Sequence, residues 1–283
     1  MSGADDWRPT SSLATLRARA ELYRTIRTFF HARGVMEVHT PCLGAATVTD
    51  PHVESIAVPG WGYLQTSPEY YLKRLLAAGM PSLYQLGPVF RADEVGRWHN
   101  PEFTLLEWYR LDYDDAALMA EVAELVDMVL GPASYVTSSY AEVLAAGPAG
   151  VDPELAFVDG LARLPGARRF VTDYPAEQAA LARLHAGADT AARFELVVAG
   201  VELANGYHEL GVAAELRQRF AADLADRREL GRSEPEPDTA FLAAMEAGLP
   251  DCAGVALGVD RLLMLQLGAD SIAEVMPFAH SRR

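Results

Sequence analysis

The sequence is poor in lysine and in net positive charge, and both shortages bear on function. Only one of its 24 basic residues is a lysine, at position 73, and the others are arginines. In a chain so rich in alanine, we attribute this bias to genome composition and draw no function from it. The formal net charge is −15, which disfavours broad contact with nucleic acid because neutralising phosphates requires a basic surface.

Cysteines and long apolar runs are also scarce. Cys42 and Cys252 are too few for a disulfide framework and lack metal-ligand spacing, so we expect two ordinary buried thiols in a reducing compartment. The sequence has no run of about eighteen apolar residues that could cross a membrane. Its first residues are acidic, where a signal peptide would be basic and then apolar. These absences predict a cytoplasmic protein without a membrane partner.

Two common nucleotide-binding signatures are missing as well. Neither G-x-x-x-x-G-K-[ST] nor G-x-G-x-x-G occurs, which excludes a P-loop and a Rossmann dinucleotide site. The chain nevertheless has 283 residues, of which 50% are apolar, and that is sufficient to bury a full core.

The clearest secondary-structure signals are helical. Apolar residues recur at helical spacing from Leu13 to Arg33. Ser67 as N-cap, with Pro68 at the first position, predicts a second helix that Gly79 ends. Two further expectations are a helix over residues 114–130 and a mixture of helices and loops over residues 131–190.

The stretch "FRADEVGRWHNPEFTLLEWYR", residues 90–110, predicts a strand, a polar loop and a second strand. Its loop brings basic side chains close to carboxylates, between two segments that carry aromatic rings. The charged residues are Arg91, Arg97, His99, Asp93, Glu94 and Glu102. A hairpin of this composition is suited to hold a ligand that has both charge and a flat face.

The stretch "RFELVVAGVELANGYHEL" spaces Glu195, Glu202 and Glu209 seven residues apart. If Ala199 and Gly200 form a hairpin turn, position 197 faces position 202, and the first two glutamates become diagonal neighbours on one face. Two such carboxylates repel each other unless cations join them, and Mg²⁺ bridged to phosphate oxygens is the usual solution. A solvated outer face with spaced glutamates is the alternative.

A third stretch, "GVALGVDRLLMLQLG", covers residues 254–268. Gly254 and Gly258 precede Asp260, Arg261 and a strongly apolar helix. Small residues let a ligand approach closely, and an arginine near a helix start can lie flat over an aromatic base. A glycine-bearing junction between strand and helix, with an ordinary surface arginine, is the alternative.

Together the three stretches resemble the signature of class II aminoacyl-tRNA synthetases. "FRADE" with "RWHNPEF" is similar to motif 2, "GVALGVDRLLML" to motif 3, and "FFHARGVMEVHTPCL" to motif 1. The lysyl branch, and within it the stand-alone elongation factor P ligases, resembles the chain over nearly its whole length. The resemblance implies an α+β fold with an antiparallel sheet flanked by helices, a single catalytic domain over residues 1–283, and a homodimer through motif 1.

The resemblance also implies a substrate and an acceptor. Lysyl-tRNA synthetases carry an N-terminal OB-fold domain that reads the anticodon, whereas motif 1 begins here at Phe29. We therefore expect no OB-fold domain and no stable tRNA binding, and the acceptor would be a lysine side chain of elongation factor P. Two alternatives stay open: an adenylating enzyme with another acceptor (a small molecule, a carrier protein or tRNA), and a non-catalytic paralogue.

The resemblance assigns the ligands of ATP and Mg²⁺. Arg91 would act at the α-phosphate, where a forked guanidinium suits developing charge, and Arg261 would lie on the adenine opposite Phe103. Glu195 and Glu202 would bind Mg²⁺, and Glu202 also ATP. The remaining ATP-binding residues that it implies are Ala92, Asp93, His99, Asn100, Leu203, Asn205 and Gly258.

For the amino acid, the resemblance places Ser67, Pro68 and Glu69 at the start of the pocket, with Glu69 taking an amino group. Glu209 and Tyr109 would hold the distal ammonium, because a buried cation needs a carboxylate and a directional partner.

Three neighbouring residues complete the expected pocket. Glu107 would assist the ammonium site, and Trp108 would pack in the core. Ala256 stands where lysyl-tRNA synthetases typically have glycine and the elongation factor P ligases have alanine. Its methyl group would narrow the pocket beside the substrate's amino-bearing carbon, favouring β-lysine over α-lysine. The alternative is that Ala256 simply packs in its strand.

Overall fold

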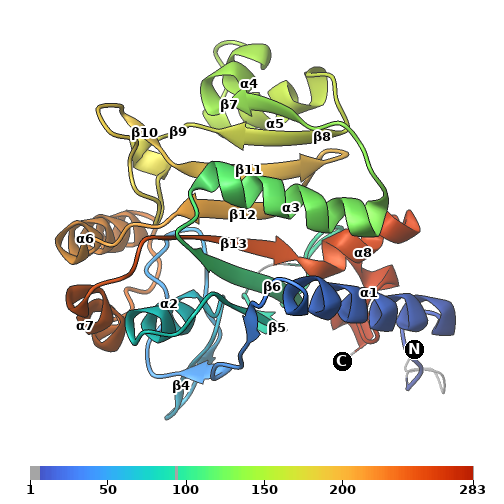
Figure 1. The fold of residues 1–283 in the computed structure, drawn as a ribbon, viewed down its shortest axis with the longest axis horizontal. Helices are drawn as coiled ribbons and strands as arrows, with labels where there is room; N and C mark the ends of the chain where they lie inside the picture. The colour runs from blue at the N-terminus through green and yellow to red at the C-terminus, as the bar shows by residue number, and fades with distance from the viewer. Residues whose placement is uncertain (1–6, 93–94, 283) are drawn as a thin grey trace.

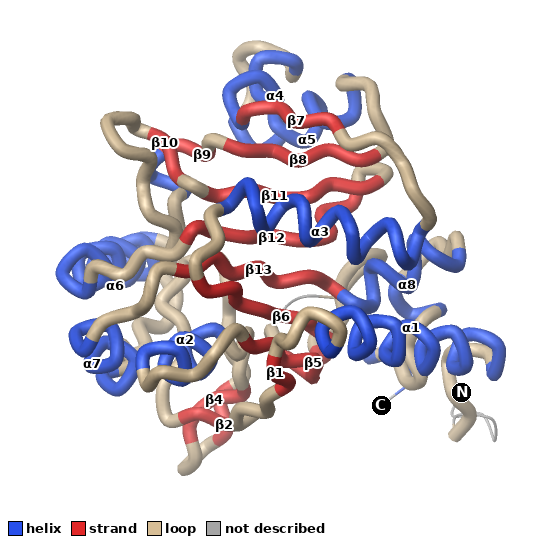
Figure 2. The backbone as a smooth tube through the Cα atoms, in the orientation of Figure 1, coloured by secondary structure: helices blue, strands red, loops and turns tan. Residues whose placement is uncertain are grey.

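The computed structural model describes residues 7–92 and 95–282. Eight strands form the main sheet: β1 (Met36–Glu37), β5 (Leu83–Phe90), β6 (Glu102–Leu111), β7 (Val136–Ser139), β8 (Arg168–Thr172), β11 (Arg193–Val198), β12 (Val201–His208) and β13 (Cys252–Gly258). Their order is β1-β5-β6-β13-β12-β11-β8-β7 (Figure 2). The pairs β1–β5 and β7–β8 at the two edges are parallel, and the pairs between them are antiparallel.

The helices are α1 (Leu13–His31), α2 (Glu69–Ala77), α3 (Asp115–Leu130), α4 (Tyr140–Ala146), α5 (Pro153–Arg163), α6 (Ala213–Glu229), α7 (Thr239–Ala247) and α8 (Val259–Leu267). Short 3₁₀ turns are η1 (Ala176–Gln178), η2 (Ile272–Glu274) and η3 (His280–Arg282). Two small sheets hold β2 (Leu43–Gly44), β4 (Gly62–Leu64) and β3 (Ala57–Val58), and β9 (Tyr174–Pro175) with β10 (Thr190–Ala191). The predicted α+β class with an antiparallel central sheet is confirmed.

One face of the main sheet carries the principal core. Helices α1, α3 and α8 cover that face (Figure 1), and alternate strand residues such as Trp108, Phe194 and Val255 point into it. Trp108 is fully buried, and its indole nitrogen donates to Glu121 Oε2 at 3.0 Å, which confirms its predicted core position. Each large apolar side chain buried in this way contributes about 1.5–3 kcal/mol to folding.

The opposite face of the sheet carries the polar residues, because successive strand residues point to opposite faces. Helices α2, α6 and α7 gather at one end of the sheet, on the left in Figure 1. They have a cluster of their own, in which the rings of Tyr70 and Phe241 stack at 4.1 Å. Helix α2 is thereby fixed next to the polar face.

The first helices agree closely with the sequence, with one shift. Helix α1 begins at Leu13 as predicted and ends at His31. Helix α2 begins at Glu69, so its N-cap is Pro68 and not Ser67. Ser67 Oγ still accepts from the Glu69 amide at 3.0 Å, and it also donates to Glu107 Oε2 at 2.7 Å. Ser67 is therefore not the N-cap of α2, and its hydroxyl group instead contacts Glu107 on the polar face of the sheet.

The hairpin around Ala199 and Gly200 forms as predicted, with both residues at positive φ of 49° and 80°. Val197 pairs with Glu202, but Leu196 pairs with Ala204, so Leu203 is the extra residue of a β-bulge. The ladder beyond that point is therefore shifted by one residue from the regular hairpin predicted.

The region expected to hold only helices and loops, residues 131–190, also contains β7, β8 and the short strands β9 and β10. That prediction was incomplete. The strand β8 opens with Arg168 and Arg169, which are buried because Tyr135, Gly131 and Ser138 supply acceptors to their guanidinium groups. Composition alone gives such a segment no strand signal.

The two cysteines are both free, and Cys252 is buried as expected. Cys42 is exposed, which contradicts the prediction of two buried thiols. It follows Pro41 just before the short strand β2, away from the core. Among the described helices, none combines the length and the apolar character needed to span a membrane.

Candidate active site

Three carboxylates from separate elements meet on the polar face of the sheet. Glu69 lies at the start of α2, Glu107 in the middle of β6, and Glu209 directly after β12. Glu107 and Glu209 are almost completely buried. The sequence predicted Glu209 and Tyr109 at one site, with Glu107 assisting, and the structure brings all of them together.

The Glu107 carboxylate is held by two hydroxyl groups. Ser67 Oγ donates to Oε2 at 2.7 Å, and the Tyr109 hydroxyl donates to Oε1 at 2.8 Å. Burial, followed by the charge of Glu69, raises the pKa of Glu107 to about 8. A carboxyl group in this state readily gives up a proton when a cation approaches.

Glu209 lies beside a buried cation that the sequence did not predict. Its Oε2 forms an ion pair with Lys73 Nζ at 2.6 Å, and both of its oxygens are buried without a hydrogen bond of standard geometry among the described residues, so Oε1 has neither kind of partner there. Burial raises the pKa of Glu209 to about 7, although the Lys73 charge opposes the rise. An acceptor oxygen without a partner in a buried site is suited to a ligand donor.

Gly254 of β13 makes room for these groups. A Cβ at that position would lie 2.3 Å from Tyr109 Cε1 and 2.4 Å from Glu209 Oε1, which is closer than side chains can approach. A residue with any side chain would therefore displace the ring or the carboxylate. Close packing against the site thus explains Gly254, the first glycine of "GVALGVDR".

Lys73 also contacts Glu69, whose Oε1 lies 2.6 Å from Nζ. The sequence held a signal for this pair, because Lys73 follows Glu69 by four residues on a predicted helix. Burial alone would lower the pKa of Lys73, but the charges of Glu209 and Glu69 raise it above its usual range. Lys73 is therefore a permanently charged member of the site.

Ala256 lies on β13 between the carboxylate cluster and the second group of predicted site residues, which surrounds Arg261. It pairs with Glu107 on β6 and with Asn205 on β12, so its methyl group lies on the same face as these side chains. Asn205 Oδ1 is buried and makes no hydrogen bond among the described residues. Its position fits the predicted contact with a ligand.

In the second group of predicted site residues, Arg261 is held at the start of α8. Its Nη1 donates to the Glu202 carbonyl at 2.7 Å, and its Nη2 donates to His99 Nε2 at 2.7 Å. Gly258 lies under the Arg261 side chain, and a Cβ at position 258 would lie 3.5 Å from Arg261 Cδ. The predicted motif 2 and motif 3 residues are therefore in direct contact.

Arg91 directly follows β5, and Phe103 lies in the neighbouring strand β6. The Arg91 guanidinium carbon lies 5.1 Å from the centroid of the Phe103 ring, and its Nε donates to the Thr66 carbonyl at 3.4 Å. Arg91 thus links the Phe103 ring to Thr66, in the segment that leads into α2.

The predicted metal ligands lie on one face of the hairpin. Burial, followed by the charge of Glu202, raises the pKa of Glu195. Arg193 Nη2 donates to Glu195 Oε1 at 2.6 Å, and Glu202 Oε2 lies 3.4 Å from Arg261 Nη1. In the part of the chain that the structure describes, no three His, Cys, Asp or Glu side chains are arranged so that they could hold a metal ion by themselves. Two neighbouring carboxylates are suitable donors for an Mg²⁺ ion, which would need phosphate oxygens and water as its other ligands.

Three predicted ATP ligands have other surroundings than expected. Asn100 is buried, and its amide joins the loop to the C-terminal segment by donating to the Glu102 carbonyl at 2.6 Å and accepting from the His280 amide at 2.8 Å. The Leu203 side chain packs in the core, so only its backbone can face a nucleotide. The Ala92 amide donates to the Glu54 carbonyl at 2.8 Å.

Asp93, which was predicted to contact the adenine amine, lies outside the described residues, as does Glu94. Pro68 precedes α2 as its N-cap. Glu69 follows at the first helical position, so the start of the predicted substrate pocket is also the start of this helix.

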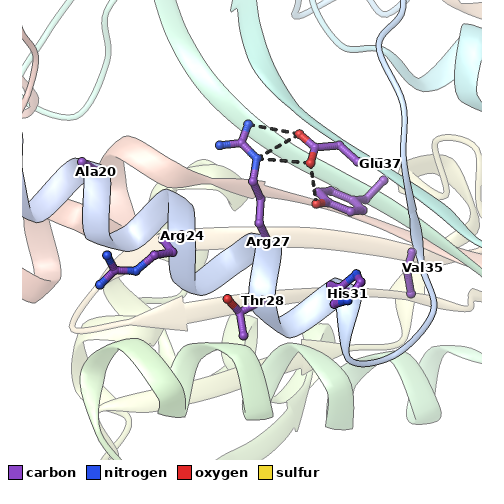
Figure 3. Close-up of a pocket in the computed structure, with 8 residues that line it drawn as sticks. Ala20, Arg24, Arg27, Thr28, His31, Val35 and Glu37 are labelled. Atoms are coloured by element: carbon purple, nitrogen blue, oxygen red, sulfur yellow. Dashed lines mark hydrogen bonds and ion pairs between the residues drawn. The ribbon is translucent and has the colours of Figure 1, made fainter.

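A surface cavity of about 530 Å³ lies apart from this site, along α1 in the predicted motif 1 region (Figure 3). Arg27 extends over it to Glu37, with Nε 3.1 Å from Oε1, and the Tyr84 hydroxyl donates to Glu37 Oε2 at 2.9 Å. Arg24 points away from that pair (Figure 3). The cavity therefore shares no residues with the carboxylate cluster.

The chain is similar to known proteins over nearly its whole length. The profile of the tRNA synthetases class II (D, K and N) matches residues 4–147 and 165–282. An "Elongation factor P--(R)-beta-lysine ligase" from Vibrio cholerae is 43% identical over 98% of this chain and 98% of that protein. Proteins with the same name from Hamiltonella defensa and Enterobacter sp. are 41% and 43% identical, each over 100% of both chains.

Proposed function

Because the chain belongs to the class II tRNA synthetases (D, K and N), we propose that it is an ATP-dependent ligase that attaches a lysine-type amino acid to elongation factor P. The observation that carries the choice of substrate is the cluster of the partly buried Glu69 with the buried Glu107 and Glu209. Three carboxylates around the single ammonium group of Lys73 leave an excess of negative charge, which favours a cationic ligand. The name of the relatives, which are (R)-beta-lysine ligases, agrees with β-lysine as that ligand.

In the first step, the carboxylate of the amino acid attacks the α-phosphorus of ATP. A bond from this oxygen to phosphorus forms, the bond to the bridging oxygen breaks, and pyrophosphate leaves. Arg91 would neutralise charge on the α-phosphate, and Arg261 with His99 would hold the other end of the nucleotide. Positioning and charge stabilisation can supply most of the rate, so no side chain acts as a nucleophile.

In the second step, the amine of the acceptor lysine attacks the carbonyl carbon of the adenylate. An amide bond forms, AMP leaves, and the amine loses a proton. Glu69 and Glu209 would keep the amino groups of the activated residue in place during this step, with Tyr109 fixing Glu107 beside them.

Mg²⁺, when bound, neutralises phosphate charge, and Glu195 and Glu202 would hold it. We further propose a single catalytic domain, a homodimer through the motif 1 region of α1 and β1, a cytoplasmic location and no stable binding of tRNA. The family resemblance supports these features, and the net charge of −15 supports weak binding of tRNA, because it disfavours broad contact with phosphates.

The test is exchange of radiolabelled pyrophosphate into ATP with (R)-β-lysine and with α-lysine, followed by transfer to purified elongation factor P. Exchange with a lysine isomer and transfer to the factor are expected, with little charging of tRNA. Exchange without transfer would show another acceptor, efficient tRNA charging would refute the acceptor assignment, and no exchange with any isomer would refute catalysis.

A further inference from the structure

Lys73, the only lysine of the sequence, is a fully buried cation inside the proposed amino-acid pocket. Its side chain is 1% exposed, and Nζ lies 2.6 Å from both Glu69 Oε1 and Glu209 Oε2. The Tyr109 ring centroid is 6.0 Å from the same nitrogen. Lys73 thus joins the two carboxylates that are proposed to hold the substrate's amino groups.

This arrangement fixes the direction of both carboxylates before a ligand arrives. Glu69 and Lys73 lie one turn apart on α2, whereas Glu209 comes from the end of β12, so the ammonium group connects the helix to the sheet. A carboxylate held by one oxygen presents its other oxygen in a defined direction. That free oxygen is Oε1 in Glu209, which is buried without a hydrogen bond among the described residues.

Lys73 also sets the charge of the pocket. Glu69, Glu107 and Glu209 supply three negative charges when ionised, and Lys73 supplies one positive charge, which leaves a net charge of −2. Arg183 does not change this count at the carboxylates, because its guanidinium bonds to the Glu209 carbonyl and to Asp251. A net charge of −2 matches a substrate with two ammonium groups whose own carboxylate faces ATP.

We propose that Lys73 is a positioning and specificity-determining residue, a built-in cation that aligns Glu69 and Glu209 and matches the pocket to a diammonium substrate. The proposal rests on the proposed function. Without Lys73, the two carboxylates would repel each other in a buried site, and one of them would take up a proton. The net charge would stay at −2, but one of the two carboxylates proposed to hold an ammonium group would then be neutral.

The experiment measures pyrophosphate exchange by Lys73→Met as a function of amino-acid concentration and pH. The KM for the lysine isomer that the wild type uses should rise at least tenfold at pH 7.5, with the KM for ATP near normal. The acid limb of kcat/KM for that amino acid should move up by about one pH unit or more. Lys73→Arg, which keeps the charge, should leave the acid limb near its wild-type position.

Tyr70→Leu is the matched control on α2, because it removes the stacking on Phe241 without changing the charge of the pocket. It should lower the thermal stability without moving the acid limb. An unmoved acid limb in Lys73→Met, or a shift of the same size in Tyr70→Leu, would overturn the proposal.

If Lys73→Met does not fold, Lys73→Ala with added methylammonium chloride tests the same point. Recovery of the folded protein and of amino-acid use supports the proposal, and no recovery overturns it. Exchange by the wild type tests the proposed function separately from these comparisons.

Discussion

At the scale of single residues, the proposed function divides the site into a half that would bind the amino groups and a half that would bind the phosphates. Glu209 is 1% exposed and is paired with Lys73, whereas Glu202 is about half exposed and lies near Arg261. Two glutamates seven residues apart on the same segment therefore have different partners. This difference predicts different defects when each is neutralised.

Glu209→Gln keeps the shape of the side chain and removes the charge that would face the substrate ammonium. The loss of a hydrogen bond to a charged group costs about 1.5–3 kcal/mol, so kcat/KM for the amino acid should fall roughly tenfold to a hundredfold. ATP binding should stay near normal. Glu202→Gln should instead weaken Mg²⁺-dependent ATP use. Steady-state exchange kinetics with each substrate varied will compare them, and the same defect in both would contradict this division of roles.

Ala256 gives a second prediction at this scale. Its methyl group lies on the face shared by Glu107 and Asn205, where it would narrow the space beside the substrate's amino-bearing carbon. One methyl group typically changes discrimination by about 1–3 kcal/mol. Ala256→Gly should therefore raise activity with α-lysine relative to β-lysine tens-fold. Exchange kinetics with both isomers decide, and an unchanged ratio would show that Ala256 only packs in its strand.

At the scale of elements, the sequence predicted the parts that have strong periodic or capping signals. Helix α3 begins at Asp115 with Asp114 as its cap, close to the predicted range of 114–130, and the hairpin of β5 and β6 lies where "FRADE" and "HNPEF" placed it. The strand β8 was missed because two buried arginines open it. Their burial depends on acceptors from α3 and β7, which no local pattern reveals.

The candidate site was predictable in its members and less so in its contacts. Motif similarity indicated Arg91, Arg261 and Glu209, and the structure places each beside other predicted residues. Motif similarity could not show that Lys73 occupies the space between two carboxylates. The helix pattern is equally compatible with a lysine that points into solvent at that position. The sequence also did not reveal the β-bulge at Leu203. A hairpin without a bulge has the same turn at Ala199 and Gly200, so the alternation of side chains along the strands fits both registers.

A buried ion pair joins the elements that carry motifs 1, 2 and 3. Arg19 of α1 donates to Asp260 Oδ1 at the start of α8 and to the Val275 carbonyl, and Asp260 Oδ2 accepts from the Thr104 amide of β6 at 2.6 Å. Removing one partner of such a pair leaves a buried charge without compensation. That typically costs about 3–5 kcal/mol.

Arg19→Met should therefore lower the free energy of unfolding by about 3–5 kcal/mol, as measured by urea titration. Arg24→Met, on the same helix, is the matched control, because its pair with Glu21 is exposed on both sides and contributes about 0–1 kcal/mol. Equal effects of the two substitutions would show that Arg19 contributes by packing of its stem alone.

At the scale of the whole molecule, the sheet separates stability from chemistry. The face under α1, α3 and α8 is apolar, while the opposite face collects carboxylates whose charge is not fully compensated. A protein with a net charge of −15 gains nothing in stability from further buried acids. Their presence is explained by a cationic ligand that completes the site, and its binding is therefore coupled to protons.

The direction of this coupling follows from the raised pKa values. The pKa of Glu107 rises to about 8 and that of Glu209 to about 7, each from 4.5, mainly through burial. The folded protein therefore holds these protons more tightly than the unfolded chain. Their contribution to stability is complete below about pH 4.5 and is lost as the pH rises through about 7 and 8. The charged or titratable groups that face the pair are Glu69, Lys73, Tyr109, Tyr207, Cys252 and Arg183.

A diammonium substrate binds the ionised carboxylates, so its binding must release the protons that the empty pocket holds. We predict that the affinity for the lysine-type amino acid increases roughly tenfold or more between pH 6 and pH 8, because each released proton changes affinity by up to tenfold per pH unit. Titration calorimetry without ATP, in two buffers of different ionisation enthalpy, measures both the affinity and the number of protons released. Glu107→Gln removes one of the two titrating groups and should reduce the proton release near pH 7.5. An affinity that does not change with pH, with no proton release, would mean that both carboxylates are already ionised in the empty site and that Lys73 alone compensates them.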